Sequence, residues 1–140
     1  MKTNSNNHWF RLENLPANSF INDIDFIRDN KYQLNWNNIS KHNNITKKFI
    51  EEFQDNIIWE QIKLHNRFSW IYLRKFKNVN WKIVNERVEF IREYSKYIYG
   101  EDYYFKDGWL IIDGSLYLYD TPITKLPDNL KVGGEIYRNF

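Results

Sequence analysis

Hydrophobic positions recur in a fixed pattern over residues 34–94. Three tryptophans stand 23 and 22 residues apart: Trp36, Trp59 and Trp81. Each is followed at the third position by an aliphatic residue: Ile39, Ile62 and Val84. Self-similarity at a fixed period is typical of a repeat architecture. The pattern predicts short helical units, and the first helix of each unit begins near its tryptophan, as over Asn35–Lys41.

A second helix is predicted in each of the first two units. Thr46 and Ser69 are good N-cap residues and stand 23 residues apart. The residues after them place apolar side chains at helical spacing: Phe49, Ile50 and Phe53, then Tyr72, Leu73 and Phe76. In the third unit the link between the helices is shorter by about one helical turn. A single helix is therefore predicted there, from about Trp81 to Tyr97.

The segments before the first tryptophan follow a weaker pattern. Residues 1–18 are mostly polar, and a loose N-terminal arm is expected there. Ser19–Ile27 is predicted to be a short helix, because its apolar residues recur at a helical period. Residues 19–99 would then form one helical repeat region.

The pattern changes after Gly100 to short aromatic and β-branched runs. Strands are predicted at Trp109–Ile112 and Leu116–Tyr119, between glycine and aspartate residues that favour turns. The tetrapeptide that begins at Gly114 recurs 20 residues later in a related form, and the apolar residues between have leucine-rich-repeat spacing. Residues 103–140 are therefore expected to form a β-rich, leucine-rich-like segment packed on the helices. The predicted fold class is α+β.

These two patterns resemble repeat proteins of bacteriophages and large DNA viruses. The segment Ile123–Ile136 is similar to their short leucine-rich-like coils, and the helical part is similar to their Trp-x-x-Ile and Phe-Ile-x-x-Phe repeats. The resemblance covers roughly residues 34–140. It implies a phage or viral origin and a role in recognition, not a reaction. Because the chain has little more than one such coil, a long concave binding surface is not expected.

Composition bounds the class of protein. The chain has 140 residues, 42% hydrophobic and 27% charged, which is typical of one globular domain with or without a small appendage. It contains no cysteine, so disulfides and cysteine-ligated metal sites are excluded. No apolar run approaches the roughly 18–20 residues that span a membrane, and the first ten residues lack a signal-peptide core. An intracellular protein, working in the cytoplasm of a host cell, is expected.

The net charge of +2 is unevenly distributed along the chain. Residues 41–100 carry twelve basic and seven acidic side chains, whereas residues 101–140 carry four basic and seven acidic ones. Between residues 63 and 82 there is no acid, and six basic residues alternate with aromatic ones: Lys63, Arg67, Arg74, Lys75, Lys77 and Lys82. Such a stretch is suited to phosphates and unpaired bases, or to an acidic protein, although a merely solvated face is the simpler interpretation.

Alignment of the first two units separates core from surface. Arg74 and Lys75 occupy the positions of two glutamates in the first unit, so both are predicted to face solvent. Trp70 and Ile71 stand where the first unit has Lys47 and Lys48. Three interpretations follow for these apolar residues: the C-terminal β segment covers them, they bind a partner, or they form a homodimer.

No constellation of residues indicates catalysis or a metal site. His42 and His65 stand at equivalent positions without the neighbours that metal binding requires, and neighbouring acids such as Glu51 and Glu52 do not face one another on a helix. Phosphate-binding loops and nucleophile motifs are missing from the sequence. The sequence therefore predicts no enzyme, no metal and no cofactor.

Two functional hypotheses remain. The first is a phage or viral interaction protein that binds and blocks a host protein or ribonucleoprotein, as counter-defence inhibitors such as anti-CRISPR proteins do. The second is a single-stranded nucleic-acid-binding protein that uses the basic and aromatic residues of the second unit. No membrane partner is expected in either case.

Overall fold

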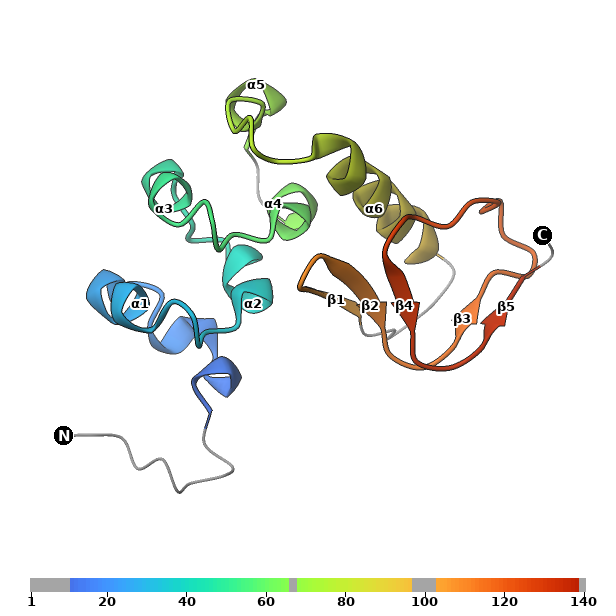
Figure 1. The fold of residues 1–140 in the computed structure, drawn as a ribbon, viewed down its shortest axis with the longest axis horizontal. Coiled ribbons are helices and arrows are strands. Elements are labelled where there is room, and N and C mark those ends of the chain that lie inside the picture. The colour runs from blue at the N-terminus through green and yellow to red at the C-terminus, as the bar shows by residue number, and fades with distance from the viewer. Residues whose placement is uncertain (1–10, 66–67, 97–102, 139–140) are drawn as a thin grey trace. The chain divides into compact units, whose positions relative to one another are not determined.

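The computed structural model describes residues 11–65, 68–96 and 103–138, and within these ranges the fold is α+β. The chain divides into two compact units, Met1–Ile58 and Trp59–Phe140. The boundary lies inside the predicted helical region. The second unit therefore contains the helices from α4 onward together with the strands (Figure 1). No helix of the described residues is long and apolar enough to cross a membrane.

The described part of the first unit, from residue 11 onward, contains three short helices after two 3-10 turns. The turns are Leu12–Asn14 and Ala17–Ser19, and the helices are α1 (Ile24–Asn30), α2 (Trp36–Ser40) and α3 (Lys47–Glu52). Each helix contributes one isoleucine that is almost completely buried: Ile27, Ile39 and Ile50. These residues make the centre of the unit's core.

Side-chain caps explain where these helices begin. Asp23, Asn35 and Thr46 each accept a hydrogen bond from the backbone N–H three residues further on. The predicted helix starts at Asn35 and Thr46 are confirmed. The predicted helix over Ser19–Ile27 is wrong in its bounds, because the Asp23 cap starts α1 at Ile24 and leaves the turn before it non-helical.

The predicted loose arm lies partly outside the described residues. From residue 11 onward it forms the two 3-10 turns, and Asn18 is held near His42, whose Nε2 lies 2.5 Å from the amide Oδ1. His42 Nδ1 also accepts a hydrogen bond from the Asn44 N–H at 3.1 Å. Both ring nitrogens of this histidine therefore have structural partners, which gives the side chain a role other than metal binding.

Three further helices belong to the second unit: α4 (Trp59–His65), α5 (Trp70–Leu73) and α6 (Trp81–Tyr94). Ser69 caps α5 and Asn80 caps α6, as Thr46 and Asn35 do for α3 and α2. The predicted fusion of two helices into one is confirmed by α6, although the helix ends at Tyr94 with Ser95 as its C-cap, short of the predicted end at Tyr97, which lies outside the described residues.

Three aromatic rings hold the start of these helices together. The Trp59 ring centroid lies 4.7 Å from that of Phe76 and 5.5 Å from that of Trp81. The indole N–H of Trp81 donates to the Phe76 carbonyl at 3.1 Å. Aromatic pairs at these distances contribute beyond the area they bury, so the tryptophans act as packing residues between helices.

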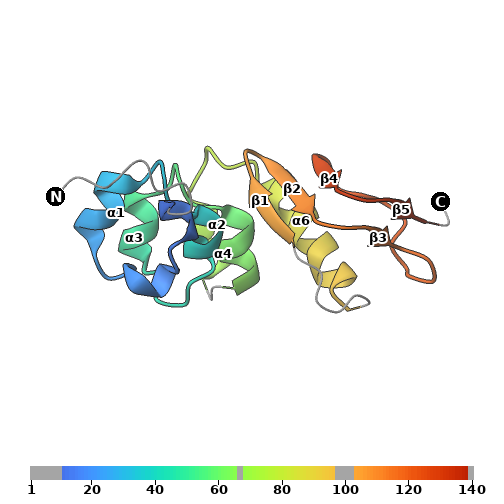
Figure 2. The same ribbon diagram turned by 90° about the horizontal axis from the view of Figure 1, so that it is seen from below.

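The strands form two small sheets. Strand β1 (Tyr103–Lys106) pairs antiparallel with β2 (Trp109–Ile112), which pairs in parallel with β4 (Leu130–Val132). Strand β3 (Leu116–Tyr117) pairs in parallel with β5 (Ile136–Tyr137) (Figure 1, Figure 2). Leu110 faces Leu130 and Leu116 faces Ile136, so both parallel pairs have the 20-residue offset seen in the sequence.

The strand predictions hold with one exception. Trp109–Ile112 is confirmed, whereas the strand predicted over Leu116–Tyr119 ends at Tyr117. The Leu118 carbonyl accepts hydrogen bonds from the backbone N–H and the hydroxyl of Thr121, and Asp120 has a positive φ of 61°. The chain therefore turns where the sequence pattern alone would extend it.

A buried ion pair ties the β1–β2 turn to the helices. Arg87 on α6 lies 2.6 Å from Glu60 on α4, and their side chains are only 6% and 8% exposed. The second terminal nitrogen of Arg87 donates to the Gly108 carbonyl in the β1–β2 turn. Burying two charges is costly unless both are well satisfied, so this pair orients three elements rather than adding much net stability.

Candidate interaction surface

The candidate surface lies on α5, a single helical turn with a buried side and an exposed side. The Ser69 hydroxyl accepts from the Tyr72 N–H at 3.3 Å and starts the helix. Tyr72 and Leu73 then point into the core and are 6% and 2% exposed. The remaining two residues point outward, with Trp70 45% and Ile71 68% exposed.

Cationic residues directly follow α5 in the sequence. Arg74, Lys75 and Lys77 are all exposed, so the predicted solvent positions of Arg74 and Lys75 are confirmed. The Lys75 ammonium lies 5.5 Å from the Tyr72 ring centroid, a cation–π distance. The exposed residues Trp70, Ile71, Arg74, Lys75 and Lys77 are hereafter the basic-aromatic surface.

Two other predicted cations have local partners. Lys82 is exposed and lies 4.0 Å from Glu86, one turn further along α6. Lys63 is half-buried, and its ammonium donates to the Asn85 side chain at 2.5 Å. Burial lowers the pKa of Lys63, and the charge of Arg92 lowers it further while Glu89 opposes this. Arg67, predicted with them, lies outside the described residues.

Trp70 packs against two residues, Trp81 and Lys63. Its ring meets Trp81 edge to face at 5.2 Å and 89°. The Lys63 ammonium lies 5.1 Å from the Trp70 ring centroid. Lys63 therefore holds the indole in place through a cation–π contact, instead of standing free beside the other cations.

The C-terminal β segment does not cover Trp70 and Ile71. Both remain exposed in the part of the chain that the structure describes, so that interpretation of the two residues is wrong. The β1–β2 turn instead contacts α6, where Arg87 donates to the Gly108 carbonyl and pairs with Glu60 of α4. The sequence could not decide this, because contacts between residues far apart along the chain depend on packing.

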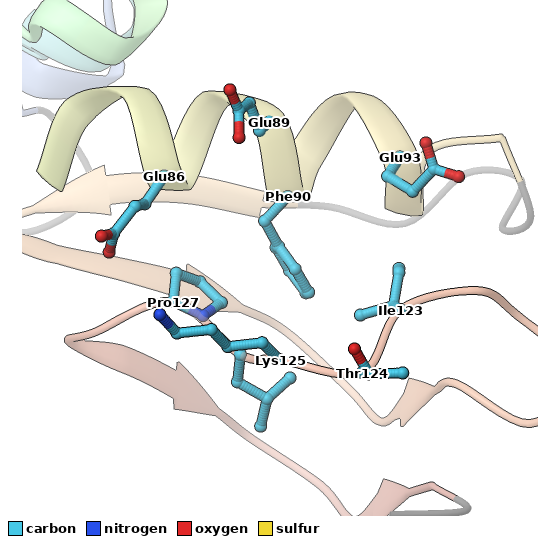
Figure 3. Close-up of a pocket in the computed structure, with 9 residues that line it drawn as sticks. Glu86, Glu89, Phe90, Glu93, Ile123, Thr124, Lys125 and Pro127 are labelled. Carbon is cyan, nitrogen blue, oxygen red and sulfur yellow. The ribbon is translucent and has the colours of Figure 1, made fainter. Parts of the chain in front are cut away.

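A pocket of about 340 Å³ lies between α6 and the segment Ile123–Pro127 (Figure 3). Phe90 points into it from the helix, and Pro127 lies across from the helix. Three carboxylates border the pocket: Glu86, Glu89 and Glu93. Two of them have nearby lysines, at 4.0 Å for Glu86 and 2.9 Å for Glu93.

This pocket was missed from the sequence. The glutamates recur three and four residues apart on one helix, a spacing that places them on one side. That signal alone predicts an acidic helix face and gives no indication of the opposing segment. Among residues 11–65, 68–96 and 103–138, no group of three metal-ligating side chains could hold a metal ion.

No protein-family model, curated protein or solved structure matches this chain.

Proposed function

We propose that this chain is a non-catalytic interaction protein that binds an acidic region of another protein through the basic-aromatic surface. One observation carries the proposal: Trp70 and Ile71 lie exposed on α5, and the next three charged residues of the chain are all cations. Exposed apolar groups rimmed by charge are typical of binding sites.

The surroundings of Trp70 favour a protein partner over nucleic acid. Stacking on an unpaired base requires an open ring face. The Lys63 ammonium already lies over the indole, and the Trp81 ring meets it at a right angle. Ile71, the most exposed of the two, is aliphatic and offers no ring for stacking. An indole beside an aliphatic group suits a pocket on a protein, and the cations suit acidic residues around that pocket.

The wider proposal is a repeat-type protein of phage or viral origin. The matched caps of α3 and α5 and the 20-residue offset of the strands support it, together with the resemblance in sequence. On that proposal the partner is a host protein or ribonucleoprotein in the cytoplasm, and blocking it is the consequence of binding. Counter-defence inhibitors, including anti-CRISPR proteins, act in this way.

A site-specific crosslinking experiment tests the proposal. A photoreactive amino acid replaces Ile71, and the full chain is irradiated in a bacterial host lysate with and without nuclease. We expect nuclease-resistant protein adducts that disappear in the double variant Arg74→Glu/Lys75→Glu. The matched control is Lys47→Glu/Lys48→Glu on α3, which changes the net charge equally and should leave the adducts intact.

Nucleic acid is the competing outcome. Binding to single-stranded oligothymidine is measured at low salt, where phosphate contacts are strongest. The proposal expects weak binding that Trp70→Ala does not change. Tight binding that Trp70→Ala abolishes, together with adducts lost on nuclease treatment, would replace the protein partner with single-stranded nucleic acid.

A further inference from the structure

The two parallel pairs of strands form two stacked rungs that differ sharply in burial. The first rung is β2 with β3, and the second rung is β4 with β5 (Figure 2). The inward residues of the first rung are fully buried at 0% exposure: Leu110, Ile112 and Leu116. Their partners in the second rung are not, since Leu130 and Val132 are half-buried and Ile136 is 39% exposed.

Backbone hydrogen bonding shows which side of the second rung has no paired strand among the described residues. The carbonyls of Asn129, Glu135 and Tyr137 accept from N–H groups of the first rung at 2.7–2.9 Å. Backbone groups of successive strand residues point to alternate sides. Leu130, Val132 and Ile136 therefore direct their N–H and C=O groups away from the first rung, at an edge that can accept another strand.

The second rung bends between β4 and β5 at two glycines. The Gly133 N–H donates to the Ile112 carbonyl at 3.0 Å, and the Gly134 N–H to the Gly114 carbonyl at 2.7 Å. A Cβ on Gly134 would lie 2.4 Å from the Ser115 hydroxyl and 3.1 Å from the Gly114 backbone, so a larger residue would require its neighbours to shift. Strand β4 runs into the bend and β5 runs out of it. A two-fold axis through the bend consequently places β4 antiparallel to β5 of a second copy.

We propose that the open rung is a homodimer interface, occupied by the same rung of a second copy. Centring the axis on Gly133 places Leu130 opposite the partner's Ile136 and Val132 opposite the partner's Gly134. The outward backbone groups of Leu130 and Ile136 then meet one another, as an antiparallel ladder requires, whereas the Gly134 N–H stays donated to the Gly114 carbonyl of its own chain. The same register places Lys131 opposite the partner's Glu135, and symmetry repeats this pair.

Charge complementarity supports this register. Lys131 and Glu135 are both exposed and of opposite sign. Oppositely charged residues directly across an antiparallel pair stabilise it, and like charges there destabilise it. The interface is small, so a weak and reversible dimer is expected. This surface shares no residue with the basic-aromatic surface, and the inference does not depend on the proposed function.

A charge-swap experiment tests the dimer with the full chain. Sedimentation equilibrium up to about 0.5 mM, within reach of a millimolar dissociation constant, should show a monomer–dimer equilibrium. Lys131→Glu and Glu135→Lys should each weaken it about tenfold or more, because each places like charges at two symmetric pairs. The double variant Lys131→Glu/Glu135→Lys should restore it. Circular dichroism confirms that each variant is folded.

Two results overturn the proposal. One is a chain that stays monomeric throughout this range, which leaves the edge to a strand of another protein. The other is a dimer that both single variants leave unchanged or that the double variant fails to restore. Ile71→Lys is the control for the alternative homodimer through α5 and should leave the equilibrium unaltered.

Discussion

Helices α3 and α5 have the same plan and opposite surfaces. Thr46 and Ser69 each cap their helix with a hydroxyl that accepts an N–H at 3.2 and 3.3 Å. Ile50 and Leu73 are equivalent and are 0% and 2% exposed. The outward positions differ, with lysines and glutamates on α3, and with apolar residues on α5 followed directly by basic ones. The comparison shows that caps and buried residues define the helix and leave the outer side free to vary.

The largest expected effect comes from the shared core position. Ile50→Ala and Leu73→Ala should each lower the free energy of unfolding by about 2–5 kcal/mol, since each removes a buried aliphatic side chain and leaves a cavity. Urea denaturation followed by tryptophan fluorescence measures this. A cost near zero at either position would show that the two helices are not equivalent in packing.

The caps should matter less, and equally. Thr46→Ala and Ser69→Ala should each lower the free energy of unfolding by about 1 kcal/mol, because each leaves an N–H of the first helical turn without its partner. The exchanges Thr46→Ser and Ser69→Thr keep the hydroxyl and serve as controls. Equal loss in the alanine variants and in the exchanged ones would argue against capping as the cause.

Exchanging the outward residue should barely change stability. Ile71→Lys gives α5 the residue that α3 has at Lys48, and the free energy of unfolding should change by no more than about 0.5 kcal/mol. Crosslinking to the partner from the adjacent position Trp70 should nevertheless fall strongly. Retained crosslinking would remove Ile71 from the proposed binding surface. The reciprocal variant Lys48→Ile places an apolar residue at the equivalent position of α3. It is the control and should gain no crosslinked adducts with the partner.

The smallest effect concerns the pH dependence of the ion pair between Arg28 of α1 and Glu52 of α3. A hydrogen bond from the Arg28 guanidinium lowers the pKa of Glu52 below its ordinary value of 4.5, with a further contribution from the arginine's charge. Stability from this pair is thus present above about pH 4.5 and is lost as pH falls through the lower, folded-state pKa. Glu52→Gln should flatten that part of the stability profile in urea titrations at successive pH values. An unchanged profile would show that Glu52 contributes nothing to it.

Much of the helical fold could be predicted because its signals are local. A cap residue directly precedes its helix and accepts an N–H three residues further on, so Asn35, Thr46 and Ser69 can be recognised in sequence. The same is true of the outward positions of Arg74 and Lys75, which follow from the buried positions beside them. The start of α1 was misplaced because apolar spacing suggested Ser19, whereas the Asp23 cap decided it.

The sequence by itself determined the buried apolar positions of α3 and α5, where most helices start and the 20-residue offset between the parallel strands. Only the tertiary structure decided which residues from distant parts of the chain contact one another. It left Trp70 and Ile71 exposed, took Lys63 into a contact with Trp70, and joined Glu60, Arg87 and the Gly108 carbonyl. The physical reason is distance along the chain. Periodicity and caps act within a few residues, whereas these contacts join residues from 7 to 27 positions apart and depend on packing.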